Sequence, residues 1–522
     1  MSRNITFTFS LAALLLLTGC KKFLKETSQD EMTPTTTTSL NELLAKEGYP
    51  YVGSAYYASD GFSFCNYLHF MDDDLHLQNM VSYNDVTTYV KPFYAWSDNA
   101  YIEATLPPAG SPSGVSGATL SNPYQQLYNR IRGCNIVIEM LPQVSGPDDD
   151  KDQIQGEALV LRAYYYLMLV NLYGWPYNAP GHDRNSSPGV PIIVKGDISA
   201  ANVARSTVAQ VYDLITSDIE KAVSLLEEKR TISTVFRVNY RVAWLLASRI
   251  YLYMEQWDKV VAYTNKLIGD YPLLADLNLW KLPVPQSITL GSNNASFIDP
   301  SNAEMLFLFS GMRGGDWSYI NLSYPQCIAS TDLTSLYETN DMRFGTYNAT
   351  NPPPNFFLNR QSGYYMNSKF YYSNGEASRC FRMAEAYANR AEAYIRTAIK
   401  GGDASLLQNA LDDLNAIRVR RFVSGAPNAT VTLASLNNDP QQVLQFCLTE
   451  RRREFSFEEF RWFDLRRYGM PSIQHTFNPN EPYVTNATLP VETYTLPQGS
   501  NRYVMKIPQN ALDANPALVQ NP

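Results

Sequence analysis

The chain has 522 residues, enough to bury one large hydrophobic core or several smaller ones without disulfides or metals to stabilise it. Its formal net charge is −8 and it contains no block of Lys and Arg, which excludes nucleic-acid binding through a basic surface. Aromatic residues make up 13 % of the chain, and its 36 tyrosines suit packed helices and half-buried ligand platforms.

The N-terminus predicts a lipoprotein signal peptide. Arg3 precedes an apolar run, residues 5–17, which is too short to span a bilayer and has the form of a secretory h-region. The run ends in Leu-Thr-Gly-Cys20, which resembles the lipobox of bacterial lipoproteins. We therefore expect cleavage after residue 19 and acyl chains, palmitate among them, on Cys20. An ordinary signal peptide with an incidental cysteine is the alternative. Residues 20–40 predict a solvated tether.

The other cysteines do not predict a disulfide framework or a zinc site. They are odd in number, far apart and without a Cys-x-x-Cys pair, so we expect small buried side chains. They are Cys65, Cys134, Cys327, Cys380 and Cys447.

The stretch HFMDDDLHL, residues 69–77, places two of the four histidines around three aspartates. A helix would separate His69 from His76 by two turns with Asp72 or Asp73 between them, which makes a transition metal conceivable. Neither a calcium loop nor His-Glu-x-x-His is present. We expect structural or ligand-binding aspartates, no metal and no cofactor.

Three long helices are predicted next. Residues 124–141 and 147–173 form an antiparallel pair. The second has acidic residues in its first turn, an apolar residue every three or four positions, and Gly174 and Pro176 at its end. Residues 207–229 predict another helix.

A helix pair with tetratricopeptide spacing follows. Trp244, Tyr251 and Pro272 occupy that repeat's aromatic and proline positions, and Ala247 and Ser248 are small where two helices must approach. A second unit begins at EAYANRAEAYIR. Its second helix begins about seven residues later than the tetratricopeptide spacing would place it. Between these helical blocks, residues 50–120 and 273–375 contain short apolar runs and many turn residues, which predict loops and short strands.

The motif TERRREFSFEEFRWFDLRRYG, residues 449–469, mixes arginines with acids three or four positions away. The arginines could bind an anionic ligand, but this spacing is typical of ion pairs on a helix surface, so we expect a structural role.

Five stretches in the same order resemble the SusD/RagB family of outer-membrane lipoproteins of Bacteroidetes. The fourth of these is the motif just described, and the fifth is the C-terminal ending. They are GEALVLRAYYYLMLVNLYGWPY (156–177), the helix pair of residues 243–267, RMAEAYANRAEAYIR with LDDLNAIRVRR, residues 449–469, and IPQNALDANPALVQNP (507–522).

The resemblance implies a mainly α fold: a tetratricopeptide-like scaffold of about four helix pairs, with a second lobe of loops and short strands. Residues 41–270 would form an N-terminal region with helical repeats. Residues 271–522 would form a C-terminal region with the loop lobe and further repeats. It also implies a lipid-anchored protein of the cell outer membrane that binds a glycan and passes it to a SusC-type TonB-dependent transporter. Lys21 and Lys22 stand where surface-exported members carry acidic residues; an exterior position is still expected.

Sugars present apolar faces beside hydroxyl groups, so a binding site needs aromatic planes and a few polar partners. Starch-binding members of the family use an arc of Trp and Tyr with a nearby Asn and Arg, and Trp96-x-x-Asn99 resembles part of that arc. For each aromatic residue, packing in the core is the alternative. The predicted ligand-binding residues are Trp96, Asn99, Tyr83, Tyr89, Trp280, Arg313, Trp317 and Tyr319.

We expect no catalytic residues, because the chain has no nucleophile elbow, phosphate loop or dinucleotide fingerprint. A carboxylate pair could still be brought together by folding, so a lipid-anchored surface glycoside hydrolase is one alternative. A peptide-binding RagB-like receptor and a pure assembly scaffold are the others.

Overall fold

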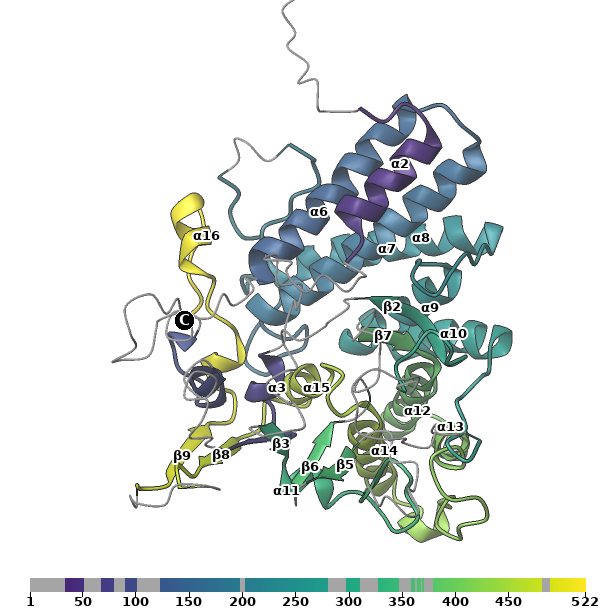
Figure 1. Cartoon of the computed structure of the whole chain (residues 1–522), viewed down its shortest axis with the longest axis vertical. Coiled ribbons are helices and arrows are strands. Elements are labelled where there is room, and N and C mark those ends of the chain that lie inside the picture. The colour runs from purple at the N-terminus through teal and green to yellow at the C-terminus, as the bar shows by residue number, and fades with distance from the viewer. Residues whose placement is uncertain are drawn as a thin grey trace, which may run out of the picture.

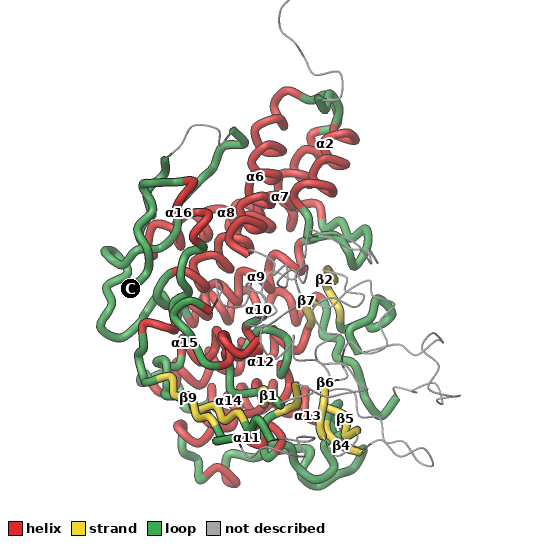
Figure 2. Tube along the Cα trace, turned by 60° about the vertical axis from the view of Figure 1, so that its left-hand side comes forward, coloured by secondary structure: helices red, strands yellow, loops and turns green. Residues whose placement is uncertain are grey.

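The structure is a computed structural model in which helices form the larger part of the described chain; most short strands lie along its lower part, and β2 (Met305–Phe309) and β7 (Arg379–Arg382) lie higher on the right (Figure 2). It describes residues 33–50, 67–78, 90–100, 123–197, 202–279, 297–309, 327–346, 358–361, 364–367, 369, 379–480 and 489–522. The predicted fold class, a helical scaffold with a second lobe of loops and short strands, is confirmed.

The first helical block surrounds one long central helix. Its elements are α2 (Thr37–Leu43), η1 (Leu44–Gly48), α6 (Pro123–Met140), η2 (Leu141–Gln143), α7 (Asp148–Tyr173) and α8 (Val208–Lys229). Asp148, Asp149 and Asp150 occupy the first turn of α7, and Gly174 follows its last turn. The last 18 residues of α7 are buried without interruption, because α6 and α8 pack against it. Helix α8 begins at a capping box in which Thr207 and Gln210 bond each other's backbone.

The predicted tetratricopeptide-like pairs follow. They are α9 (Tyr240–Tyr253) with α10 (Trp257–Asp270) and α12 (Met383–Ile399) with α13 (Leu406–Arg418), and α14 (Pro440–Phe455) packs on both α12 and α13. Helix α8 packs on α9, and α10 packs on α12, so neighbouring pairs form one continuous stack (Figure 1). Ser248 is fully buried between α9 and α12, where its hydroxyl receives the Asn389 amide at 3.1 Å.

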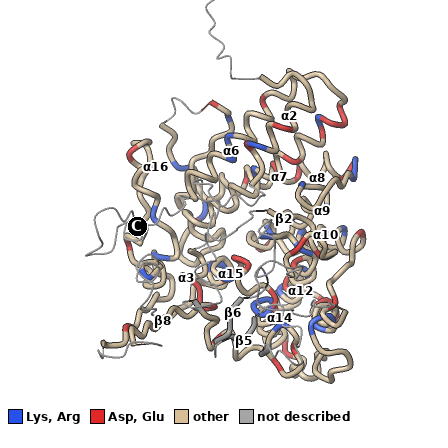
Figure 3. Tube along the Cα trace, in the orientation of Figure 1, with Lys and Arg blue, Asp and Glu red and all other residues tan. Residues whose placement is uncertain are grey.

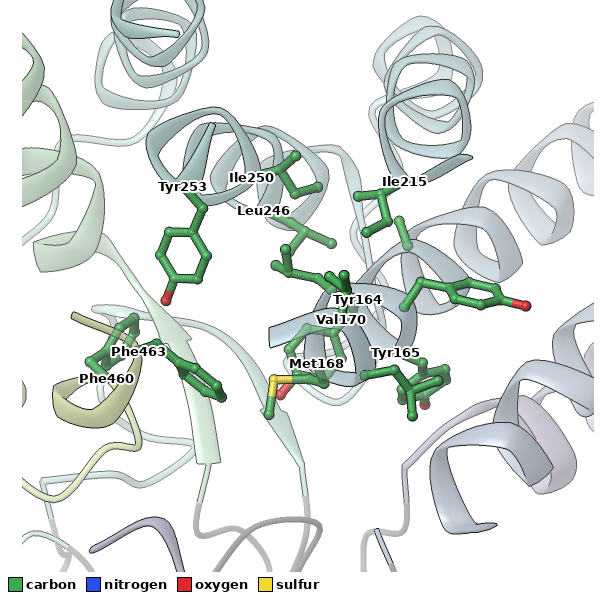
Figure 4. Packing of buried hydrophobic residues seen from close by; sticks show 14 of the residues in the cluster. Tyr164, Tyr165, Met168, Val170, Ile215, Leu246, Ile250, Tyr253, Phe460 and Phe463 are labelled. Atoms are coloured by element: carbon green, nitrogen blue, oxygen red, sulfur yellow. The ribbon is translucent and has the colours of Figure 1, made fainter. Parts of the chain in front are cut away.

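One large apolar core joins the scaffold to the loop lobe. Figure 4 shows Tyr164 and Met168 of α7 between the α9 side chains and the rings of Phe460 and Phe463. The core cluster runs from Leu40 near the N-terminus to Ile507 near the C-terminus, so both halves of the chain contribute to it.

The second lobe consists of short strands and short helices. The strands are β1 (Leu75–Leu77), β2 (Met305–Phe309), β3 (Cys327–Ala329), β4 (Phe344–Thr346), β5 (Leu358–Gln361), β6 (Tyr364–Asn367), β7 (Arg379–Arg382), β8 (Ile473–Phe477) and β9 (Glu492–Leu496). They form the separate antiparallel pairs β1–β3, β2–β7 and β8–β9, and a β4–β5–β6 sheet. The short helices are α3 (Leu68–Met71), α11 (Thr331–Thr334), α15 (Arg461–Arg467), η5 (Asn501–Tyr503) and α16 (Gln509–Ala514); η4 (Ala434–Leu436) packs instead on the scaffold cluster of α12, α13 and α14.

Two smaller findings concern the membrane and the cysteines. None of the helices in the described ranges combines the length and apolar character needed to cross a membrane. Cys134 and Cys447 are free thiols in the core, as expected, and Cys380 is a free thiol that is only half-buried.

Candidate ligand-binding region

The acidic stretch 69–77 forms a tight turn between α3 and β1. Helix α3 ends at Met71 and is followed by its C-cap residue Asp72, whose side-chain oxygen accepts the Asp74 amide N–H at 2.9 Å. Asp72 and Asp74 are buried, with 1 % and 0 % exposure. We call residues Asp72, Asp73 and Asp74 the acidic turn.

Two arginines from the C-terminal motif hold the acidic turn. The guanidinium of Arg461 donates to both carboxylate oxygens of Asp73, at 2.6 and 2.8 Å. Arg452 donates to the Asp74 carboxylate at 2.7 Å and to the Asp73 carbonyl at 2.9 Å. These aspartates therefore have a structural role, one of the two roles expected for them. Across the described ranges, no three His, Cys, Asp or Glu side chains are grouped as metal ligands.

The carboxyl groups of this turn differ in acidity. Burial raises the pKa of Asp73, but Arg461 and Arg452 outweigh it and lower that pKa to about 2. Burial dominates at Asp74 and raises its pKa to about 6, although Arg452 opposes the shift. Burial also raises the pKa of Asp72, so the acidic turn contains one strongly acidic carboxyl, Asp73, between two weakly acidic ones.

Trp96 lies in the core and not on an open platform. Its side chain is 2 % exposed, its ring stacks on His475 with centroids 4.1 Å apart, and its indole N–H donates to the Met71 carbonyl at 2.9 Å. This burial corrects the prediction that Trp96 presents a face to a ligand. Its backbone φ of 49° lies in the left-handed region that bulky residues rarely adopt. Asn99, three residues on, is exposed.

The other predicted ligand-binding residues and the lipidation site lie outside the described residues. They are Tyr83, Tyr89, Trp280, Arg313, Trp317, Tyr319 and Cys20. The strand pairs nevertheless bring together described residues far apart in the sequence. Leu77 pairs with Cys327 in β1–β3, and Phe309 pairs with Arg379 in β2–β7. Gln78 directly follows Leu77 of the first pair. The same described range, residues 67–78, contains Met71, whose carbonyl accepts the Trp96 indole N–H.

Sequence reasoning missed a small aromatic hollow beside this region. A cavity of about 40 Å³, room for a few water molecules, lies between α7, α9, the β2–β7 pair and the turn after α14. The turn has positive φ at two non-glycine residues, Phe457 (60°) and Glu459 (65°). Phe457 also packs on His69 of α3, with ring centroids 5.8 Å apart. The alternating aromatic residues of FSFEEF were the available signal. The rings that line the hollow belong to Tyr164, Tyr253, Phe309, Phe381, Phe457, Phe460 and Phe463.

The arginine-rich motif forms a buried ionic network and not the expected set of pairs on a helix surface. Arg343 and Arg418 both pair with Glu450, at 2.7 and 2.9 Å, although they are 107 and 32 positions away in sequence order. Glu454 receives Arg382 and Arg421 at 2.7 and 2.8 Å. Pairs at the expected spacing also exist, such as Arg453 with Glu450. The structural role is confirmed, and Figure 3 shows the charges gathered around α12 and α14.

The described geometry defines a class of protein. In this class, buried ion pairs attach a lobe of loops and short strands to a helical-repeat scaffold. Two family models match in chain order, one described as "Starch-binding associating with outer membrane" over residues 22–252 and one described as "SusD family" over residues 306–522. The chain belongs to the SusD/RagB family.

Individual relatives are distant in sequence. The chain is 23 % identical over 380 residues to SusD-like protein P38 of Formosa agariphila, covering 66 % of this chain and 71 % of that protein. A SusD superfamily protein from Bacteroides vulgatus superposes with a TM-score of 0.65 at 21 % identity, covering 94 % of this chain and 99 % of that one. One from Bacteroides thetaiotaomicron gives 0.64 at 22 %, covering 94 % and 100 %. These structures share the fold.

Proposed function

We propose that this protein is a non-catalytic lipoprotein of the outer membrane that binds a glycan and delivers it to a SusC-type TonB-dependent transporter. The observation that carries the proposal is the pair of family models, in order, one described as starch-binding and associated with the outer membrane. A Bacteroides vulgatus protein with the same fold is titled a SusD-like carbohydrate binding protein, with a TM-score of 0.61 at 19 % identity and coverage of 93 % of this chain and 97 % of that one.

Membrane attachment is proposed to occur through acyl chains on Cys20. The lipobox-like ending Leu-Thr-Gly-Cys20 supports this anchor, and the tether that follows would hold the body away from the bilayer. The protein would face the cell exterior, where a polymer is accessible. No enzyme chemistry is required of it, since capture and transfer change no covalent bond.

Ligand contact is proposed for the aromatic loop residues together with the exposed Asn99. Tyr83, Tyr89, Trp280, Trp317 and Tyr319 supply ring planes. Arg313 and Asn99 supply hydrogen-bond donors. Trp96 is left out of this set because its ring is covered by His475.

Calorimetry and affinity gels on the purified mature protein, with a panel of glycans and peptides, test the proposal. Saturable glycan binding without new reducing ends supports it. The appearance of reducing ends would identify a glycoside hydrolase instead. Binding of peptides alone would identify a RagB-like peptide receptor, and binding of protein partners without any saccharide would identify a scaffold.

Delivery is tested separately by affinity purification from outer membranes. A TonB-dependent transporter should be recovered in stoichiometric amount with the wild-type protein. Recovery of the glycan-binding protein alone would remove the transporter from the proposal and leave glycan binding intact.

A further inference from the structure

The acidic turn has more negative than positive groups around it. Asp72, Asp73 and Asp74 follow one another between α3 and β1, and the cations in contact with them in the described ranges are Arg452 and Arg461. Burying an unbalanced carboxylate is costly, because the low-dielectric interior does not replace its hydration. Three carboxyl groups against two guanidinium groups therefore favour the retention of one proton.

The hydrogen bonds point to Asp74 as the group that holds it. Both oxygens of Asp73 are taken by Arg461, and Asp72 accepts the Asp74 amide. Only one oxygen of Asp74 is engaged, by Arg452; Oδ2 is buried and has no hydrogen-bond partner within the described ranges. A protonated carboxyl has no net charge. It can therefore leave one buried oxygen without an ionic partner at a lower desolvation cost than a carboxylate can.

The other titratable groups around the turn carry no permanent positive charge. His69 of α3 lies 3.8 Å from the Asp72 carboxylate, and His475 of β8 contacts the Asp72 and Tyr94 carbonyl oxygens at 2.8 Å each. Burial lowers the pKa of His475, and its two nitrogens face backbone carbonyl oxygens, so its ring does not pair with a carboxylate of the turn. The remaining titratable groups facing the turn are His76 of β1, Tyr337 after α11 and Tyr503 of η5.

We propose that the acidic turn is a proton-binding switch, in which Asp74 holds one proton in mildly acidic solution and releases it as the pH rises toward neutrality. The raised pKa of Asp74, about 6, agrees with this assignment. Release leaves a third negative charge in the turn that packs α3 and β1 against the arginines of α14 and α15. The Ser330 backbone N–H and hydroxyl donate to the Asp74 and Asp73 carbonyls at 2.8 and 2.7 Å, so the charge also acts on the segment that follows β3.

A consequence for ligand capture rests on the function proposed above. The acidic turn connects α3 and β1 at the junction of the loop lobe with the scaffold. Glycan affinity should therefore be several-fold weaker at pH 8 than at pH 5.5 in the wild type, and it should lose this dependence in Asp74→Asn.

The switch itself is tested without ligand by thermal unfolding of the full mature chain between pH 4 and 8. The unfolded Asp has a pKa of about 3.9. Because the folded value is higher, the contribution of Asp74 to stability is greatest below the unfolded pKa and is lost as the pH rises to about 6. Asp74→Asn mimics the protonated form, so its melting temperature should match the wild type near pH 4 and exceed it by about 2 °C at pH 7.5.

Asp73→Asn is the matched control, one residue away. Because the pKa of Asp73 is about 2, this carboxyl is ionised at pH 5 and at pH 7.5, and Asp73→Asn, which loses the bond to Arg461, should be destabilised at both, unlike Asp74→Asn. A difference between Asp74→Asn and wild type that is constant with pH would overturn the proposal. So would a difference abolished by millimolar calcium, which would show that a cation balances the turn. Absence of glycan binding would remove the proposed function and leave this result standing.

Discussion

The Arg461 guanidinium donates hydrogen bonds to both carboxylate oxygens of Asp73, a residue 388 positions away in the sequence. Both side chains are mostly buried, at 16 % and 21 % exposure, so solvent screens the pair weakly. Arg461→Gln should lower the free energy of unfolding by about 2 kcal/mol, since it leaves a partly buried carboxylate without its bidentate partner.

A double-mutant cycle with Asp73→Asn measures this pair in urea unfolding. The coupling energy should be roughly 1 to 3 kcal/mol. Arg502→Gln is the control, because Arg502 and Asp98 form an exposed pair at 42 % and 61 % exposure, and no measurable loss is expected there. Additive effects of the Arg461 and Asp73 variants would contradict the assignment.

The buried ionic network predicts sensitivity to acid. Burial raises the pKa of Glu392, but Arg467 and Arg396 lower it to about 2; Glu450, held by Arg343 and Arg418, also has a pKa of about 2. Both folded values lie below the unfolded value near 4.3, so the stabilisation is complete above about pH 4.5 and is lost as the pH falls toward 2. Each carboxylate contributes roughly 3 kcal/mol at neutral pH.

Unfolding by urea at successive pH values from 7 to 2.5 checks this prediction. Glu392→Gln should be destabilised at pH 7 and should show a shallower loss below pH 4.5. A wild-type protein whose stability did not fall in this range would contradict the network's depressed pKa values.

Two glycines make a matched pair for the packing of the N-terminal helices. A Cβ on Gly133 of α6 would meet the backbone carbonyl of Glu47 in η1, whereas a Cβ on the exposed Gly269 of α10 would meet nothing within 4 Å. Gly133→Ala should destabilise the protein by about 2 kcal/mol, since backbone must move. Gly269→Ala should stabilise it by about 0.5 to 1 kcal/mol through helix propensity. Thermal unfolding of the two variants checks this prediction. Equal changes in melting temperature for Gly133→Ala and Gly269→Ala would show that η1 and α6 are not closely packed at Gly133.

Trp96 and Trp317 separate packing from ligand contact. Trp96→Ala should cost about 3 to 5 kcal/mol of stability, because it empties a buried site between Met71 and His475. Trp317→Ala should weaken glycan binding roughly tenfold, or about 1.4 kcal/mol. Calorimetric unfolding and glycan titration of both variants provide the test. Unchanged affinity in Trp317→Ala would remove that residue from the proposed site.

Cys20→Ser should abolish the lipid anchor. The variant has no thiol to acylate, so metabolic labelling with a palmitate analogue should fail and the protein should leave the membrane fraction. Serine at the same position keeps the size of the side chain, which controls for folding. Retention of the variant in the outer membrane at wild-type levels would indicate another means of attachment.

The helical scaffold could be predicted from the sequence because its signals are local. The apolar spacing of α7, its acidic first turn and the capping residue Thr207 act within a few residues of each other, and the expected helix boundaries held to within one or two positions. The resemblance of the ordered motifs to SusD/RagB is likewise a property of the chain alone.

Only the tertiary structure decided what the charged and aromatic residues do. Folding brings Arg461 into contact with Asp73 and Arg343 into contact with Glu450. These residues lie on segments far apart in the sequence, and no spacing rule predicts such partners. For the same reason Trp96, expected on a ligand platform, was found covered by His475 from β8. Local periodicity fixes which face of a helix is apolar, but burial and pairing depend on which distant segment arrives against that face.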